Sequence, residues 1–390
     1  MKTILFHVNS LLTGGIEKVL IELLKGLNPQ KYHVKLSIGY YMGEQELLRN
    51  DVPSYVEVIY LLEHPLLTTP HKNKKTGKTN VVEKALSELL LPPIQKKVRR
   101  QKLKRILKEV DVVIDFDTTL ASMHRMFSDK ISIAYCHFGF DNIWKDNQRK
   151  LDKLAYRLSH YTHIVMLCDE MLKDAAQRYP MLSPKLARIY NALDIPLLQA
   201  KANETLHLSD DFIRNGYILS VGRLQEAQKD FTTLLKAYAE AVHKYRIKER
   251  LIIVGKGGDQ SNLQQLAMSL GIENRVLFTG HQSNPYKWMK PARLFLFSSK
   301  YEGLPTVLIE AHAIGLPIVA TASPTGVKEL LLQGNAGTLV PIGVVSIMAD
   351  AIVELLRNEP LRKEYLREAA SLLPQFNIDY MVPELEKLLG

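Results

Sequence analysis

The segment SSKYEGLPTVLIEAHAIGLPIVAT, residues 298–321, predicts a strand exit, a helix and a second strand in close succession. The apolar run ARLFLFSS ends where the segment begins, and Pro305 suits the first turn of a helix, where its missing N–H has no intrahelical partner to lose. The backbone N–H groups of Leu304, Thr306 and Val307 then face the loop, together with the positive end of the helix dipole. This order is typical of parallel α/β sheets and favours an anion site in the loop.

Two glutamates flank this loop: Glu302 precedes the helix and Glu310 lies within it. Because they stand on different elements, they are not a simple i, i+4 pair on one helix face. We expect them to be aimed at different parts of one elongated ligand, Glu310 at vicinal hydroxyls such as those of a ribose and Glu302 at a group beyond a diphosphate. The alternative for each is an ordinary carboxylate near a helix N-terminus, stabilised by the dipole.

Short apolar runs alternate with longer helical stretches along the whole chain. The strand candidates of the first half are TILFHV, VKLSIGY, VEVIYL, VDVVIDF, ISIAYCH and HIVMLC, and those of the second half are YILSVGRL, RLIIVGKG, RVLFTG, RLFLFSS, PIVATA and GTLVP. This alternation predicts parallel strands joined by helical crossovers. We expect two doubly wound α/β domains over residues 1–195 and 196–375, a polar linker over 192–215, and a C-terminal helix over 376–390 that packs back towards the first domain.

The composition is typical of a globular enzyme, since 46% of the 390 residues are hydrophobic and 24% are charged. No apolar run approaches the ~20 residues that span a bilayer, and the opening MKTILFHVNS has too short an apolar stretch for a signal peptide. We therefore expect a cytoplasmic protein. Cys136 and Cys168 each lie in an apolar, strand-like run without CxxC or zinc spacing, which predicts buried, reduced thiols.

The net charge of +10 comes from one segment, residues 71–108, which holds thirteen Lys or Arg against two Glu. Within it, IQKKVRRQKLKRILKEV predicts a helix with Leu103 and Ile106 on its apolar face; Lys96 and Arg99 fall on the Leu103 side. The adjoining KNKKTGKTN, residues 72–80, predicts a mobile surface loop. Water, an anionic phospholipid surface and the phosphate of an acceptor each suit the cations of the helix, which are Lys96, Lys97, Arg99, Arg100, Lys104 and Arg105. No nucleic-acid module accompanies the charge, so nucleic acid is not expected as a partner.

Two further strand ends carry glycine and cationic residues. Gly14 and Gly15 follow the first strand and precede a helix, which suits either close approach to an anion or a tight turn. In SVGRLQEAQKDF, Gly222 ends a strand and is followed by Arg223 and Lys229, a planar fork of donors and a point charge that together suit a diphosphate. Solvation of both side chains at the surface is the alternative. IVGKGG repeats the order of strand, glycine and helix, which suits either a nucleotide or tight packing of the backbone. The spacing is not GxGxxG, so a dinucleotide is disfavoured.

The motifs VGRL, VGKGG, VLFTGH, EGLPTVLIEA and SPTGVKELLLQGNAGTLVP together resemble glycosyltransferase family 4, the retaining enzymes of GT-B fold. The resemblance covers nearly all of the second half, whereas the first half matches at Gly14-Gly15 and at AYCHFG. It implies two Rossmann-like domains that face a central cleft, the first for an acceptor and the second for a nucleotide sugar. The last motif looks like that of members that build lipopolysaccharide, capsule or lipid-linked glycans.

By this resemblance, Arg223 and Lys229 neutralise the leaving diphosphate, Glu310 binds the ribose and Glu302 lies beside the transferred sugar. His137, in AYCHFG, reaches towards the donor sugar, with a satisfied strand-end histidine as the alternative. Glu226 departs from the pattern because it places a carboxylate near the expected phosphates. The donor contacts extend to a set of glycines and to the loop itself: Gly14, Gly15, Gly222, Gly257, Gly303, Leu304, Pro305 and Thr306.

The implied reaction has no side-chain nucleophile, because the acceptor hydroxyl attacks from the face that the phosphate leaves. Cationic side chains take the role of a metal, so no cofactor is expected, and DFD at residues 115–117 is a weak metal candidate. The implied partners are a nucleotide diphosphate sugar such as a UDP-sugar, a lipid-linked or lipopolysaccharide-type glycan, and the anionic inner face of the cytoplasmic membrane. A UDP-sugar 2-epimerase and a catalytically silent partner subunit, both of GT-B fold, are the alternatives.

Overall fold

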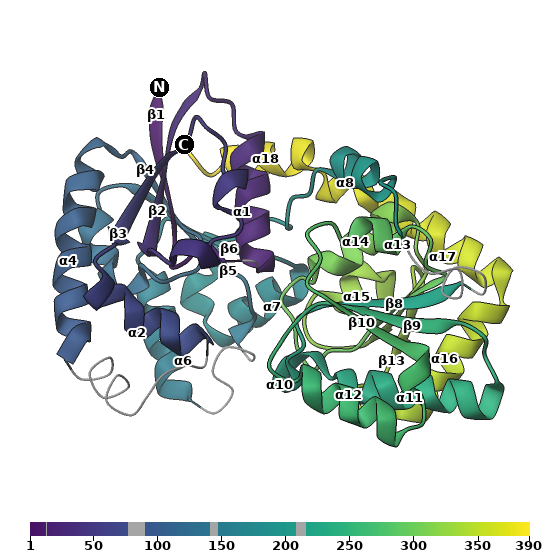
Figure 1. The fold of residues 1–390 in the computed structure, drawn as a ribbon. Helices are drawn as coiled ribbons and strands as arrows, with labels where there is room; N and C mark the ends of the chain where they lie inside the picture. The colour runs from purple at the N-terminus through teal and green to yellow at the C-terminus, as the bar shows by residue number, and fades with distance from the viewer. Residues whose placement is uncertain (13, 77–89, 141–146, 208–215) are drawn as a thin grey trace. The chain divides into compact units, whose positions relative to one another are not determined.

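The computed structural model describes residues 1–12, 14–76, 90–140, 147–207 and 216–390. The chain divides into two compact units. The first unit comprises Met1–Leu167, Leu172–Ala192 and Met381–Gly390, and the second comprises Cys168–Met171 and Leu193–Tyr380. Each unit is built on one parallel sheet with helices packed on it (Figure 1). The predicted pair of doubly wound α/β folds is confirmed.

The sheet of the first unit has seven parallel strands in the order β3-β2-β1-β4-β5-β6-β7. Their bounds are β1 (Lys2–Val8), β2 (Tyr32–Tyr40), β3 (Glu57–Leu62), β4 (Val112–Asp115), β5 (Ile131–Cys136), β6 (His163–Met166) and β7 (Leu186–Arg188). Ile4, Leu5 and Phe6 of β1 are all fully buried, because helices cover both faces of a parallel sheet. The chain order reverses between β1 and β4, so the carboxyl ends of these neighbouring strands form the expected ligand-binding edge.

The helices of the first unit include α1 (Gly15–Gly26), α2 (Pro65–Thr76), α4 (Leu91–Ile106), α6 (Gln148–Leu158) and α7 (Asp169–Arg178). The predicted basic helix is α4, which packs along the edge strand β3 and buries Leu103 and Ile106 (Figure 1). The predicted loop over 72–80 is wrong for residues 72–76, which continue α2, while 77–80 lie outside the described residues. Helix α2 is held by a tertiary contact, since Gln95 of α4 donates to the carbonyl of Leu67 in α2 at 2.9 Å.

The sheet of the second unit has six parallel strands in the order β10-β9-β8-β11-β12-β13. Their bounds are β8 (Tyr217–Val221), β9 (Arg250–Val254), β10 (Val276–Gly280), β11 (Leu294–Phe297), β12 (Ile318–Thr321) and β13 (Thr338–Val340). All six were predicted. Here the order reverses between β8 and β11, and these two strands are the ones that lead into the predicted cations and the predicted glutamates.

The helices of the second unit include α8 (Ile195–Ala202), α10 (Glu226–Lys229), α11 (Phe231–Tyr245), α12 (Gln260–Ser269), α13 (Tyr286–Met289), α14 (Thr306–Ile314), α15 (Val327–Leu330), α16 (Val345–Arg357) and α17 (Glu359–Leu372). The last helix, α18 (Ile378–Glu386), has residues in both units. The predicted linker over 192–215 is wrong where α8 lies: Asp194 caps this helix by accepting from the N–H of Leu197 at 2.9 Å. Residues 208–215 lie outside the described residues, and the short strand β7 was not predicted.

Cys136 and Cys168 are buried and form no disulfide, as predicted. Burial raises the pKa of each thiol to about 12. Across the described ranges, no helix combines the length and the apolar character needed to pass through a bilayer.

Candidate active site

Several of the residues predicted to bind a donor gather at the carboxyl ends of the adjacent strands β8 and β11. Arg223 follows β8 directly, Lys229 ends the short helix α10, and Glu302 lies in the exit loop of β11. Helix α14 begins at Thr306, so Pro305 is its N-cap and not its first residue. The first N–H groups of α14 have no intrahelical acceptor, and they lie at the same sheet edge as the cations.

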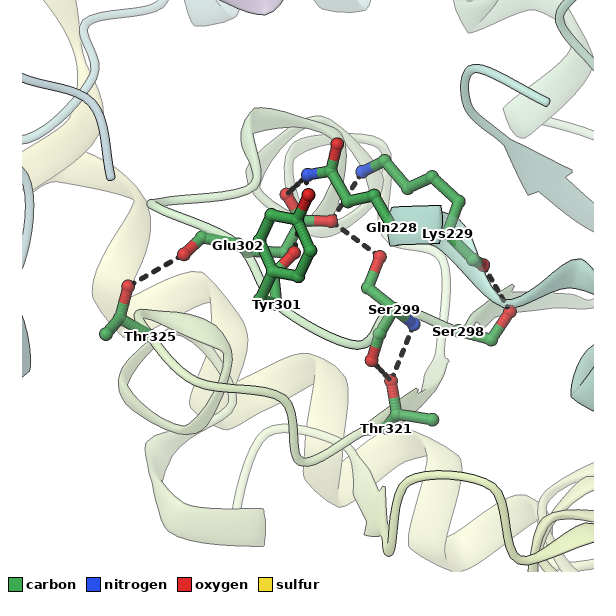
Figure 2. Close-up of polar contacts among 8 residues, drawn as sticks. All are labelled: Gln228, Lys229, Ser298, Ser299, Tyr301, Glu302, Thr321 and Thr325. Atoms are coloured by element: carbon green, nitrogen blue, oxygen red, sulfur yellow. Dashed lines mark hydrogen bonds and ion pairs between the residues drawn. The ribbon is translucent and has the colours of Figure 1, made fainter. Parts of the chain in front are cut away.

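The centre of this edge is an ion pair between Lys229 and Glu302, shown in Figure 2. The Lys229 Nζ lies 2.5 Å from Glu302 Oε1, and the two side chains are 17% and 7% exposed. The Ser299 hydroxyl donates to the same oxygen at 2.5 Å, and Gln228 Nε2 lies 3.4 Å from Glu302 Oε2. Glu302 is therefore not an exposed helix-end carboxylate, because lysine, serine and glutamine side chains fix both of its oxygens.

The backbone of the exit loop is tied to the end of β12. Ser299 and Thr321 exchange hydrogen bonds, since the Ser299 N–H donates to Thr321 Oγ1 at 2.8 Å and this hydroxyl donates to the Ser299 carbonyl at 2.9 Å (Figure 2). The Thr325 hydroxyl donates to the carbonyl of Glu302 at 2.9 Å. The loop that carries Glu302 is thus held from both ends, which preorganises the carboxylate.

Glu310 lies inside α14 and is only 5% exposed. The hydroxyl of Tyr286, the first residue of α13, donates to its Oε1 at 3.3 Å. Glu302 and Glu310 therefore have different partners on different elements, and their separate roles towards a ligand stay a prediction. No motif in the sequence identifies Tyr286 as a site residue; it lies in the short helix α13.

Arg223 is exposed, unlike Lys229. The loop that carries it crosses the glycine loop after β9: a Cβ atom at Gly257 would overlap the carbonyl of Leu224. Tight packing therefore accounts for Gly257, and the prediction that it contacts a donor stays a prediction. Glu226, the residue that departs from the family pattern, accepts a hydrogen bond from the N–H of Thr232 and so helps to cap α11.

In the first unit, Gly14 precedes α1 as predicted and is its N-cap, whereas Gly15 is already the first residue of the helix. A Cβ atom at Gly14 would overlap the carboxylate of Glu17, so an acidic group of the chain itself lies against the glycine pair. This carboxylate gives no help to a phosphate at the N-terminus of α1. The predicted contact of Gly14 and Gly15 with a donor stays a prediction.

His137 follows β5 and is buried. Its Nε2 lies 2.6 Å from the carbonyl oxygen of Phe116, which can only accept, so Nε2 carries the proton and Nδ1 is the acceptor. Burial lowers the pKa of His137 to about 4, so the ring is neutral at pH 7. A neutral imidazole is suited to donating or accepting hydrogen bonds and not to neutralising a phosphate.

The aspartates of DFD are engaged within the protein. Asp115 accepts from the hydroxyl of Tyr161 at 2.6 Å and from the N–H of Leu120 at 3.0 Å, and Asp117 accepts from the N–H of Asn9 at 2.7 Å. Burial, together with the neighbouring Asp117, raises the pKa of Asp115 to about 8. In the part of the chain that the structure describes, no three His, Cys, Asp or Glu side chains gather as metal ligands would.

The sequence pattern of the family described as glycosyl transferases group 1 matches residues 213–371, which include the paired Lys229 and Glu302. Over its full length the chain is 29% identical to N-acetylgalactosamine-N,N'-diacetylbacillosaminyl-diphospho-undecaprenol 4-alpha-N-acetylgalactosaminyltransferase of Campylobacter jejuni, with 100% of each protein covered. It is 32% identical to the lipopolysaccharide core biosynthesis glycosyltransferase LpsE of Rhizobium meliloti, over 44% of this chain and 49% of that protein.

Solved structures share the fold at low sequence identity. Anabaena HepE in complex with UDP-glucose is similar with a TM-score of 0.74 at 19% identity, over 99% of this chain and 100% of that chain. WaaG, a glycosyltransferase involved in lipopolysaccharide biosynthesis, is similar with a TM-score of 0.70 at 14% identity, over 99% of each chain. The resemblance inferred from the motifs is confirmed: the chain is a glycosyltransferase of GT-B fold, and its residues 213–371 form a glycosyl transferases group 1 domain.

Proposed function

We propose that the protein transfers a hexose or N-acetylhexosamine from a UDP-sugar to a lipid-linked or lipopolysaccharide-type glycan, with retention of the anomeric configuration. The observation that carries this proposal is the buried pair of Lys229 and Glu302 at the strand ends where Arg223 and Glu310 also lie. The full-length relative from Campylobacter is named for a transfer onto a diphospho-undecaprenol glycan, and HepE binds UDP-glucose, which supports this choice of acceptor and donor.

The chemistry follows from the charges at this edge. The bond between the anomeric carbon and the diphosphate oxygen breaks, and negative charge builds on the departing phosphate while the sugar becomes oxocarbenium-like. Arg223, Lys229 and the first N–H groups of α14 stabilise that charge, a role that is typically worth a few kcal/mol per well-placed donor. The acceptor hydroxyl forms the new bond on the same face and gives its proton to the leaving phosphate.

The two glutamates take separate parts of the donor. Glu310, held by Tyr286, binds the ribose hydroxyls. Glu302 already holds Lys229, so a sugar hydroxyl that bonds to its second oxygen is placed beside the cation that meets the phosphate. Because two protein cations serve the diphosphate, we propose that catalysis needs no metal ion.

The basic surface of α4 meets the membrane that carries the acceptor. Its exposed cations form no ion pair with any residue in the described ranges; they are Lys96, Lys97, Arg100, Lys104 and Arg105. Leu66 of α2, Leu90 and Ile94 are 73%, 62% and 51% exposed, and they supply apolar groups that can enter the headgroup layer. We propose a peripheral protein on the anionic inner face of the cytoplasmic membrane.

A donor and acceptor screen tests the reaction. Purified protein is incubated with UDP- and GDP-sugars and with lipid-linked glycan acceptors, and nucleotide release and product mass are recorded. We expect UDP together with an acceptor that is one sugar heavier. A new UDP-sugar formed without acceptor would instead identify a 2-epimerase. Nucleotide binding without any product across the screen would favour a silent partner subunit.

A further inference from the structure

Arg99 differs from the other predicted cations of α4 in where its side chain lies. The others are exposed, whereas Arg99 is half-buried and its guanidinium turns towards the carboxyl edge of the first sheet. Its Nη2 lies 3.5 Å from Nε2 of His7 in β1. Its guanidinium carbon lies 5.7 Å from the ring centre of Tyr40, the last residue of β2. Arg99 therefore belongs to the ligand-binding edge of this sheet and not to the water-facing basic surface.

The guanidinium charge has no neutralising partner in this position. Its Nε is buried without a hydrogen-bond partner, and none of the residues that the structure describes forms an ion pair with it. Burial, and then the charge of Arg99 itself, hold the pKa of His7 well below its usual range, so that ring is neutral. Asp115 and Asp117 act on Arg99 through the electrostatic field alone. A partly desolvated cation of this kind is costly, and a bound anion would offset the cost.

The side chains beside Arg99 are held in position by contacts of their own. Tyr40 stacks on His71 of α2, with ring centres 4.1 Å apart and ring planes 5° from parallel. Its hydroxyl donates to Gln95 of α4 at 3.2 Å, and the His7 imidazole is held by the Ser37 hydroxyl at 2.8 Å. Contacts from three elements thus fix the surroundings of Arg99. The planar guanidinium of Arg99, which carries an unpaired charge between these ordered side chains, suits the oxygens of a phosphate.

We propose that Arg99 binds a phosphate of the acceptor, at the carboxyl ends of β1 and β2. This inference rests on the proposed function, in which the donor diphosphate has its own cations, Arg223 and Lys229, in the second unit. The exposed cations of α4 then attract the membrane surface, while Arg99 distinguishes an acceptor that carries a diphosphate from one that does not. Different residues of the same helix therefore serve membrane attraction and acceptor selection.

Steady-state kinetics in detergent test Arg99→Gln against Arg149→Gln, which removes the same charge from an exposed site on α6. Two acceptors are compared: a glycan on a polyprenyl diphosphate and the same glycan on an alkyl chain without phosphate. We expect Arg99→Gln to raise KM at least about tenfold for the diphosphate acceptor, and to leave the alkyl acceptor and the donor KM unchanged. Arg149→Gln should change neither acceptor by more than about twofold. Equal losses with both acceptors would assign Arg99 a merely structural role and overturn the proposal.

A binding experiment judges Arg99 even if the screen finds no transferase activity. Inorganic pyrophosphate is titrated calorimetrically into each protein with the donor site saturated by UDP. Binding by wild type and by Arg149→Gln, its loss in Arg99→Gln and partial recovery in Arg99→Lys are the expected results. Unchanged binding in Arg99→Gln would overturn the proposal. Co-sedimentation with anionic phospholipid vesicles should be the same for Arg99→Gln and wild type, and its loss would assign Arg99 to the membrane surface instead.

Discussion

At the carboxyl edge of the second sheet, Lys229 lies 2.5 Å from Glu302, whereas at the carboxyl edge of the first sheet Arg99 faces His7 and Tyr40, with no ion-pair partner among the described residues. At the second edge the charge of Lys229 is paired within the protein, and serine and glutamine side chains hold Glu302, while Arg223 stays exposed. The first edge keeps a positive charge that a ligand can neutralise. The difference teaches that the same sheet architecture supports two kinds of anion site, one preorganised by an internal ion pair and one completed by its ligand.

The largest effect is expected at the donor edge, from Arg223→Ala. Arg223 is exposed, and its side chain forms no hydrogen bond or ion pair with any of the described residues, so its removal tests transition-state charge stabilisation. We expect kcat/KM to fall at least about a hundredfold, equivalent to roughly 3 kcal/mol. Lys236→Ala, which removes an exposed charge from α11, is the control. A rate near that of wild type for Arg223→Ala would remove this arginine from the site.

The next largest effect separates the two glutamates. Glu302→Gln should lower kcat about ten- to a hundredfold with little change in the donor KM, because its oxygens position Lys229 and the reacting sugar. Glu310→Gln should raise the donor KM about tenfold with little change in kcat, because ribose contacts are the same in the ground and transition states. Identical changes in the two variants would show that the separate roles are wrong.

Surface attraction should give a smaller, salt-dependent effect. We expect the wild type to sediment with anionic vesicles at low salt and several-fold less at high salt, since screening acts over about 8 Å at physiological ionic strength. A variant with Gln in place of the exposed cations should stay in the supernatant; the changed residues are Lys96, Lys97, Arg100, Lys104 and Arg105. Equal sedimentation with anionic and neutral vesicles would rule out the membrane role.

The smallest effect concerns the stability of the first unit against pH. The pKa of Asp115 is about 8 in the folded protein, whereas the ordinary value of an aspartate is 3.8. The folded state therefore binds more protons than the unfolded state, and stability falls as pH rises between these two values. His137, with a pKa of about 4, adds stability as pH rises from 4 to 6.5 and loses it as pH falls through that range. Below pH 6.5 the titrations of Asp115 and His137 change stability in opposite directions. Above pH 6.5 His137 no longer contributes, and the effect of Asp115 is seen without it.

Asp115→Asn should therefore flatten the decline in unfolding free energy between pH 6.5 and 8, which is at most about 1.4 kcal/mol per pH unit for one group. Urea unfolding at pH 6.5, 7.2 and 8 measures this. Asp129→Asn, at an exposed position, should keep the slope of the wild type. The same slope in the Asp115→Asn protein would mean that Asp115 does not titrate differently in the folded state.

The sequence predicted the strands well because each parallel strand needs an apolar run of its own. It missed β7, which is three residues long, and it missed the helical end of α2, where Tyr40 stacks on His71 and Gln95 bonds to Leu67. Such contacts join segments far apart in the chain, and local composition does not signal them. For the same reason a polar linker was expected where α8 packs.

The candidate site divides in the same way. Glu302, Glu310 and Lys229 could be predicted because strand order brings the ends of β8 and β11 together. The helical period placed Arg99 on the apolar side of α4, but it could not show that His7 and Tyr40 lie beyond it. Tyr286 has no signal at all, since its role depends on the distance of its hydroxyl from Glu310.

The burial of Cys136 and Cys168 makes the natural chain a suitable background for site-directed labelling. Thiols with a pKa near 12 form almost no thiolate at neutral pH, so maleimide or nitroxide reagents should pass them by. A cysteine introduced at an exposed position, such as Arg149 in the first unit or Lys236 in the second, would then be modified selectively. Spin labels at these two positions would follow the separation of the units as donor and acceptor are added, without removal of a native cysteine.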